Sequence, residues 1–217
     1  MSSVFAHSLV AASIYNMRSR SASALPRSRH IRNKLANFLW LSWLIVIASF
    51  PDLDYIIPLL HSSANQGLRI THSVIFSLIA PLITIGLLWQ FKISKENLIV
   101  YSLQAFAAGL SHLILDLLVG VTPLPLLFPL NLHKFRLPFG ILPSAGRIDF
   151  GNYYLYRNLY LEMGVLLPIL GLVCLYGDRS FDKPQHRKMV FSIKFLASGI
   201  LIVCCWHFIR LNLALPR

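Results

Sequence analysis

The sequence predicts an all-α fold: a single membrane-embedded domain over residues 1–217, built from about five transmembrane helices and a short N-terminal helix. Of the 217 residues, 56% are hydrophobic and only 13% are charged, whereas soluble domains have roughly 25% charged residues. The mean hydropathy of +0.63 points the same way. The apolar residues also gather in stretches long enough to cross a bilayer. These observations favour an integral membrane helical bundle.

The apolar stretches can be placed in order along the chain. Residues 3–17 predict a short apolar helix. Spans close to the length of about 20 residues that a bilayer core requires are then expected near 38–60, 73–91, 97–120, 159–177 and 191–211. The last two are generic spans, whereas the motifs described below fall within residues 5–140.

The loops predict which ends of the spans face the cytoplasm. Lys and Arg total 20 against 8 Asp and Glu, a formal net charge of +12 that suits anionic lipid head groups. The loops at 18–34, 92–95 and 179–194 carry most of the basic residues, so the positive-inside rule makes them cytoplasmic. We therefore expect a multi-pass protein of the cell inner membrane, whose partner is the lipid bilayer. A specific nucleic-acid partner is not expected, because loop 18–34 has no interleaved aromatic residues.

Residues 121–158 are too irregular for a span. Prolines and glycines recur throughout the segment, although Leu124, Leu126 and Leu127 keep its first part apolar. Irregular backbone is tolerated at membrane depth only where it is buried in protein or lines a cavity. The sequence therefore predicts a re-entrant or interfacial loop that folds against the protein and can cover a site.

The third expected span carries a histidine and an aspartate four residues apart, His112 and Asp116. At helical spacing these side chains stand one turn apart on the same face and can reach one shared point. Ionisable groups are costly inside a membrane and indicate function by default. This pair therefore predicts one wall of a metal site or of an acid/base site.

Other polar side chains are expected to reach the same depth. Asp52 and Asp54 follow Pro51, which is expected to kink the first long span. His72 opens the next span, and His7 lies about 15 Å along its helix from the cytoplasmic face. Because carboxylates and imidazoles together suit a divalent ion, the sequence predicts one metal site on the non-cytoplasmic side.

Each of these residues also has a simpler interpretation. His112 and Asp116 can join neighbouring helices by hydrogen bonds, His7 can be a packing residue, and Asp54 can cap a helix end. Glu162 lies near the start of its span, where a side chain can reach the surface, so it is only an outside candidate for the site.

The motifs taken in order resemble those of the YdjM-type family, whose members are membrane-bound and classed as metal-dependent hydrolases. The resemblance covers roughly residues 5–140. It is carried by His7, Pro51-Asp52-Leu53-Asp54, Thr71-His72-Ser73, Ser111-His112-x-x-x-Asp116, Pro125-Leu126-Leu127-Phe128-Pro129 and Phe135-Arg136-Leu137-Pro138. In one place the chain departs from the family, because Gly67-Leu68-Arg69-Ile70 precedes Thr71 where members usually carry His-Arg-Gly-x.

The resemblance implies a distant relation to the zinc-dependent phospholipase C and single-strand nuclease superfamily, which is all-helical. It implies that zinc is the cofactor. Carried over by position, the metal ligands are His7, Asp52, His72, His112 and Asp116, and Asp54 is a ligand or the catalytic base.

Together these observations predict a membrane-bound metal-dependent hydrolase, in which a metal-activated water attacks an ester or phosphodiester. The membrane setting favours a lipid or lipid-linked substrate. Two alternatives stay open: an ion- or proton-translocating protein that uses the same Asp and His residues, and a catalytically silent membrane scaffold. Serine catalysis is not favoured, since the chain has no G-x-S-x-G motif.

Overall fold

The computed structural model describes residues 2–19, 30–55, 57, 69–144, 151–177 and 187–214. Over these residues the regular elements are helices, which confirms the predicted all-α fold. They are α1 (Val4–Ser19), α2 (His30–Ser49), the 3-10 helices η2 (Phe50–Tyr55) and η3 (Ile70–His72), α4 (Val74–Gln90), α5 (Lys95–Val119), α6 (Tyr153–Gly177) and α7 (Arg187–Ala214).

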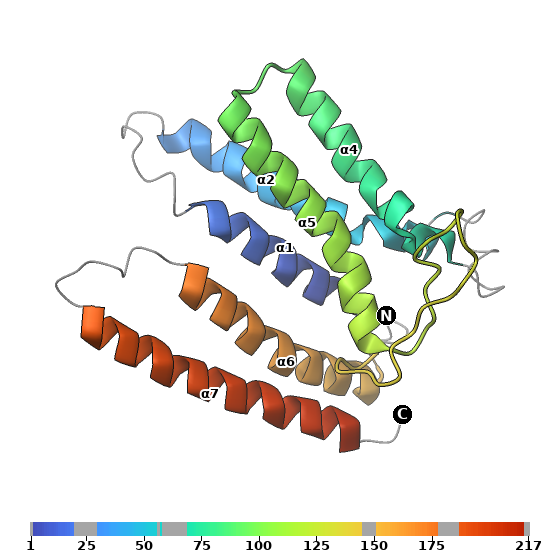
Figure 1. Cartoon of the computed structure of the whole chain (residues 1–217), viewed down its shortest axis with the longest axis vertical. Coiled ribbons are helices and arrows are strands. Elements are labelled where there is room, and N and C mark those ends of the chain that lie inside the picture. The colour runs from blue at the N-terminus through green and yellow to red at the C-terminus, as the bar shows by residue number, and fades with distance from the viewer. Residues whose placement is uncertain are drawn as a thin grey trace.

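The helices lie side by side in one elongated bundle (Figure 1). α4 packs on α5, and α5 packs on both α1 and α2. The helix α1 contacts α6 on its other side. The helix α6 also packs against α7, which lies at the edge of the bundle. The helix α1 therefore lies between the α2–α4–α5 group and the α6–α7 pair.

Four helices are long and apolar enough to cross a membrane: Lys34–Asp54, Lys95–Val119, Tyr153–Tyr176 and Phe191–Ala214. The remaining predicted span, 73–91, corresponds to α4, which is apolar but has only 17 residues. At 1.5 Å per residue it rises about 26 Å, slightly less than the hydrocarbon core of about 30 Å. Part of the basic loop 18–34, and of loop 179–194, lies outside the described residues.

The first long span changes from an α-helix to a 3-10 helix next to Pro51. The α-helix α2 ends at Ser49, and the chain continues through Pro51 as the 3-10 helix η2. Proline lacks the backbone N–H that would continue the ladder and crowds the preceding turn. The tighter turns of η2 place Asp52 and Asp54 at the end of the span.

The neighbouring helices also begin and end at this end of the bundle. The Ser73 hydroxyl accepts a hydrogen bond from the Phe76 backbone N–H and so caps the start of α4. Helix α5 ends at Val119 and is followed by Gly120, whose φ of 63° is left-handed and favours glycine. A Cβ atom there would lie 2.9 Å from the Phe139 carbonyl oxygen.

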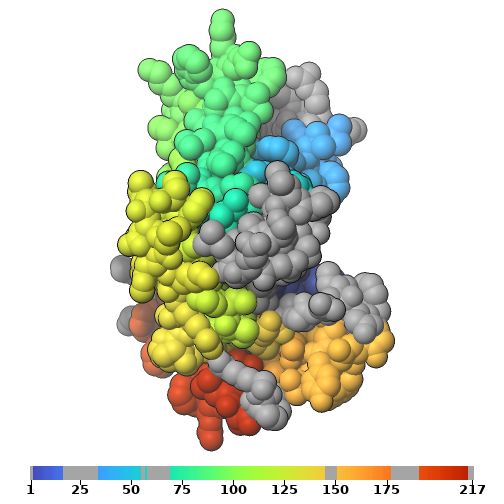
Figure 2. Space-filling model, turned by 90° about the vertical axis from the view of Figure 1, so that its right-hand side faces the viewer, coloured from blue at the N-terminus to red at the C-terminus, as the bar shows by residue number. Residues whose placement is uncertain are grey.

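Residues 121–144 are irregular, as predicted, and run along this end of the bundle (Figure 2, yellow). The predicted end of the irregular segment at 158 is wrong, because α6 already begins at Tyr153. Backbone hydrogen bonds join Leu124 to Phe135 in an isolated antiparallel bridge. The Val74 N–H donates to the Leu126 carbonyl, and the Asn212 side chain donates to the Gly140 carbonyl. The segment is therefore fixed to the start of α4 and to the last turn of α7.

Helices α4 and α5 approach closely at Gly109. A Cβ atom at this position would lie 2.6 Å from the Ser77 carbonyl oxygen and 2.9 Å from Pro81 Cγ. We expect Gly109→Ala to push the helices apart and to cost about 1–3 kcal/mol, measured as a lower Tm in detergent. The control is Gly86→Ala, where a Cβ meets nothing within 4 Å. Equal melting temperatures for the two variants would contradict this packing.

Candidate metal centre

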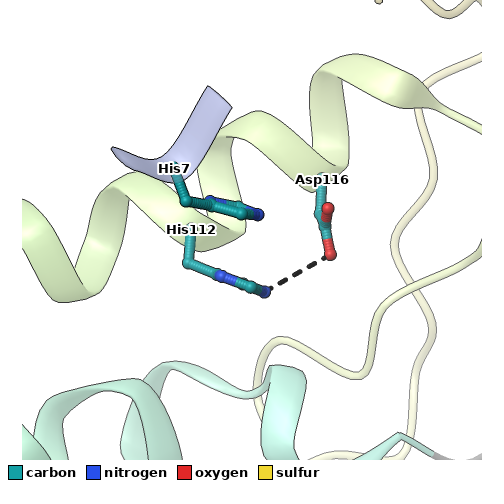
Figure 3. A group of neighbouring side chains, drawn as sticks. All are labelled: His7, His112 and Asp116. Carbon is teal, nitrogen blue, oxygen red and sulfur yellow. Dashed lines mark ion pairs between the residues drawn. The ribbon is translucent and has the colours of Figure 1, made fainter. Parts of the chain in front are cut away.

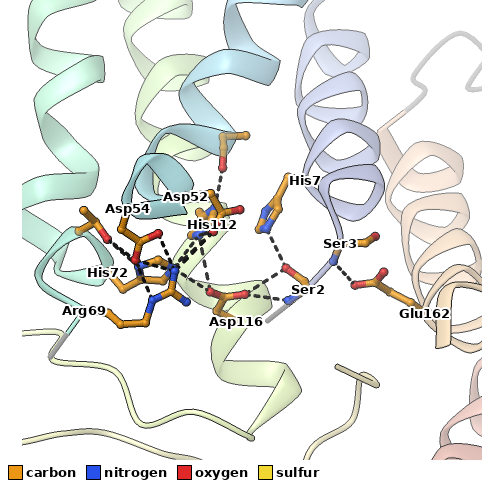
Figure 4. Close-up of polar contacts among 12 residues, drawn as sticks. Ser2, Ser3, His7, Asp52, Asp54, Arg69, His72, His112, Asp116 and Glu162 are labelled. Carbon is orange, nitrogen blue, oxygen red and sulfur yellow. Dashed lines mark hydrogen bonds and ion pairs between the residues drawn. The ribbon is translucent and has the colours of Figure 1, made fainter. Parts of the chain in front are cut away.

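Four predicted ligands come together at the end of the bundle where α2 ends and α4 begins (Figure 4). Asp52 comes from η2, His72 from η3, and His112 and Asp116 from the last turns of α5. The two histidines and Asp116 are fully buried, whereas the Asp52 side chain keeps 19% of its surface exposed. Access to the cluster is therefore on the side of Asp52.

The His72 ring is oriented by its neighbour in the chain. Its Nδ1 lies 2.9 Å from the Thr71 hydroxyl, which donates its proton to Asp54 Oδ2 at 3.2 Å. The hydroxyl has a single proton, so it accepts from His72 Nδ1–H. The Nε2 lone pair of His72 is consequently turned into the cluster.

His112 is held in the same tautomer by a backbone carbonyl. Its Nδ1 lies 2.7 Å from the Ala48 oxygen, which can only accept, so Nδ1 carries the proton. The Nε2 atoms of His112 and His72 then face one another at 3.3 Å. Two lone pairs at this distance repel each other unless a cation or a proton lies between them.

Two carboxylate oxygens complete the group. Asp116 Oδ2 lies 3.2 Å from His72 Nε2 and 3.6 Å from His112 Nε2. Asp52 Oδ1 lies 3.7 Å from each of the same two nitrogens. Both oxygens are buried and have no hydrogen-bond partner among the described residues. Since buried polar atoms normally have a partner, we expect a proton or a cation to bind these two oxygens.

The spacing suits a tetrahedral metal ion. Zinc bonds of about 2.0–2.1 Å to imidazole nitrogen and carboxylate oxygen place neighbouring ligand atoms about 3.3–3.4 Å apart. The five distances given above between these nitrogen and oxygen atoms run from 3.2 to 3.7 Å. Shifts of a few tenths of an ångström therefore close the site around an ion. Asp52, His72 and His112 form a group of potential ligands whose atoms lie within 4.8 Å of one another.

His7 adds a second, overlapping group. Its ring stacks on His112 with 4.1 Å between the ring centres and 9° between the planes (Figure 3). His7, His112 and Asp116 again offer ligand atoms within 4.8 Å of one another. His7 Nε2 lies 2.8 Å from the Ser2 hydroxyl, and its Nδ1 has no partner among the described residues.

Asp54 lies next to the cluster but has other partners. Its carboxylate receives two hydrogen bonds from Arg69, at 2.8 Å from Nε and at 2.7 Å from Nη2. Thr71 supplies a third. Asp54 belongs to neither group of potential ligands among the described residues. Its predicted role as the base stays a prediction, and its contacts make it an outer partner that orients His72 through Thr71.

The centre has an excess of negative charge that a divalent cation would balance. Asp52, Asp54 and Asp116 bring three negative charges, and Arg69 compensates one of them. Burial disfavours the charged imidazole of His72, but contacts with the Asp116 and Asp52 carboxylates outweigh this and raise its pKa. The centre therefore has a net charge of about −2 when its histidines are neutral, which a divalent ion balances.

Sequence reasoning missed several residues around the site. Arg69 has no role of its own in the sequence analysis, where it stands in the segment that departs from the family pattern, although a lone arginine close in sequence to two aspartates is a usable signal. Thr71 was part of a motif without a role of its own. Glu162 was only an outside candidate, and its contact with Ser3, like the contact of Ser2 with Asp116, depends on the tertiary fold. No local pattern marks them.

Replacing Thr71 by Val removes the hydroxyl that orients His72 while keeping the shape of the side chain. We expect the affinity for Zn²⁺ to fall about 10–100-fold, the usual cost of losing an outer partner. Competition with a chromogenic chelator in detergent measures it. Thr71→Ser should restore binding, and Thr122→Val is the control, because the Thr122 hydroxyl has no partner among the described residues. Wild-type affinity in Thr71→Val would contradict the role of the hydroxyl.

Comparison with known proteins places the chain in a family. The model of a family described as YdjM inner membrane protein matches residues 5–185. Neither a search of curated proteins nor a search of solved structures gives a match. The matched range includes the whole candidate centre and reaches beyond the part on which the sequence resemblance rests. The chain belongs to the YdjM inner membrane protein family.

Proposed function

We propose that this protein is a membrane-bound metal-dependent hydrolase. The observation that carries the proposal is the meeting of two histidine Nε2 atoms with two buried carboxylate oxygens that have no hydrogen-bond partner among the described residues. Such an arrangement is unfavourable unless a cation or a proton lies among these atoms, and a divalent ion satisfies all four of them. Asp52, His72, His112 and Asp116 are the proposed ligands, with His7 beside them.

The donor set favours zinc. Two imidazole nitrogens and two carboxylate oxygens suit Zn²⁺, whereas Mg²⁺ and Ca²⁺ prefer oxygen ligands alone. We propose one ion rather than two, because both groups of potential ligands need His112. The Nδ1 of His112 is committed to the Ala48 carbonyl, so only its Nε2 can bind a metal. His7 then serves as a fifth ligand of the same ion or as an alternative one.

Residues near the proposed ion account for access to the site and for removal of the water proton. When bound, a divalent ion supplies a Lewis acid and an activated water. Asp52, the most accessible of the proposed ligands, marks the side on which water and substrate enter. Two hydrogen bonds from Arg69 hold the Asp54 carboxylate in place, and Asp54 is the predicted base for the water proton.

We further propose that the substrate is a lipid or lipid-linked ester or phosphodiester and that the site lies on the non-cytoplasmic side. Inner-membrane location and the place of the centre at one end of the spans support the first point. The excess of Lys and Arg in the loops at the opposite end supports the second.

The test begins with metal analysis of the purified protein, followed by hydrolysis assays on phosphodiester and lipid ester substrates in mixed micelles. We expect about one zinc per chain, together with hydrolysis that chelation and His72→Ala both abolish. Zinc-loaded protein that hydrolyses nothing but carries pH-driven ion flux in vesicles would overturn the proposal in favour of ion translocation. Protein that holds no metal would favour a silent scaffold.

A further inference from the structure

Glu162 of α6 is a buried carboxylate that the proposed metal site does not use. Glu162 is only 1% exposed. It lies in a helix that is apolar enough to cross a membrane. The sequence suggested that it reaches the surface, but the structure turns it toward the start of α1 instead. There its Oε1 accepts a hydrogen bond of 2.9 Å from the Ser3 backbone N–H. A carboxylate buried in such a helix is costly and marks a function.

Ser2 and Ser3 connect this carboxylate to the metal centre (Figure 4). The Ser3 N–H is bound by Glu162, and the Ser2 N–H donates to Asp116 Oδ1 at 2.9 Å. The Ser2 hydroxyl lies 2.8 Å from His7 Nε2 and 3.2 Å from Asp116 Oδ1. Consecutive backbone amides are thus held by carboxylates from two different helices, α6 and α5.

The same contacts set the position of α1. The Ser3 hydroxyl accepts from the Ala6 N–H and caps the helix, and the Glu162 carboxylate lies at its positive end. His7 follows in the first turn. A shift at Ser3 would therefore move the His7 ring and the Ser2 group that holds Asp116.

We propose that Glu162 is a positioning residue of the metal centre. It fixes Ser2 and Ser3 so that Asp116 Oδ1 is occupied by Ser2, which leaves Asp116 Oδ2 directed at His72 and His112. The inference rests on the proposed metal site. The sequence of α6 shows only a generic span, but through Glu162 this helix would position a ligand of that site.

A matched control lies at the opposite end of α1. Gln104 of α5 is also buried, and its side-chain N–H donates to the Ile14 carbonyl at 3.0 Å. It accepts from the Trp40 indole N–H at 2.9 Å. Gln104 thus fixes α1 by the same kind of bond, far from the proposed ligands.

The experiment compares Glu162→Ala, Glu162→Gln and Gln104→Ala in the full chain. Glu162→Ala should weaken Zn²⁺ binding about 10–100-fold, as loss of an outer partner does. Glu162→Gln should bind nearly as the wild type, because its amide oxygen still accepts from Ser3. Gln104→Ala should lower the Tm but keep the affinity. Equal affinity losses in Glu162→Ala and Gln104→Ala would overturn the proposal.

A second measurement uses metal-free protein and keeps the two proposals separable. Carbethoxylation of His7 with diethyl pyrocarbonate, mapped by mass spectrometry, should be faster in Glu162→Ala than in the wild type and unchanged in Gln104→Ala. If the wild type binds no metal, the proposed hydrolase fails and this rate alone decides on Glu162. An unchanged His7 rate in Glu162→Ala would then refute its positioning role.

Discussion

His112→Ala is expected to remove metal binding altogether. His112 Nε2 is common to both groups of potential ligands, and its other nitrogen is fixed by the Ala48 carbonyl. We expect the metal content to fall from about one ion per chain to a small fraction, a loss larger than the 10–100-fold effect of an outer partner. Elemental analysis after purification in detergent measures it.

Two further variants make this result interpretable. His133→Ala removes an exposed histidine from segment 121–144 and should leave the metal content unchanged. Asp116→Asn keeps the size of the side chain and an oxygen for Ser2 while removing the charge, so it tests the ligand role if His112→Ala folds poorly. Full metal content in both His112→Ala and Asp116→Asn would show that the ion, if any, binds elsewhere.

Arg69→Leu is expected to have the largest effect on stability. It leaves the Asp54 carboxylate, which is 2% exposed, without the guanidinium that pairs with both of its oxygens. Breaking a buried ion pair by removing one partner costs about 3–5 kcal/mol. For a chain of this size that lowers the Tm by about 6–20 °C. Thermal unfolding followed by tryptophan fluorescence in detergent measures the change.

The double variant Arg69→Leu/Asp54→Leu identifies the cause. If the loss comes from an uncompensated buried charge, removing Asp54 as well should recover much of the Tm. Lys95→Leu, which removes an exposed cation at the start of α5, should stay within about 0.5 kcal/mol of the wild type. An unchanged Tm in Arg69→Leu would mean that the pair does not stabilise the fold.

Local spacing and depth were enough to predict which parts of the centre lie together. His112 and Asp116 are one helical turn apart, so their shared face follows from the period of the α-helix. Pro51 marks the end of α2 and thereby places Asp52 at the end of a span. Span lengths then bring His72 to the same end of the bundle.

The supporting contacts could not be predicted in this way. The pairing of Arg69 with Asp54 depends on how η2 and η3 pack, and both are short 3-10 helices without a periodic pattern. The bond from Glu162 to Ser3 depends on the contact of α6 with α1, helices more than a hundred residues apart in the sequence. Such contacts follow from tertiary packing, on which hydropathy and motif spacing carry no information.

The short length of α4 has a consequence for the surrounding lipids. Its outward side chains, such as Leu82, Ile83 and Leu87, are exposed along a helix that rises only about 26 Å. If α4 crosses the bilayer, lipids beside this face would meet a hydrophobic mismatch of a few ångström, to which a bilayer can adapt by thinning locally. Because η3 and His72 directly precede α4, such thinning would bring lipid head groups nearer to the proposed metal centre. The lipid-linked ester of the proposed function would then reach the site together with its own leaflet, without leaving the membrane.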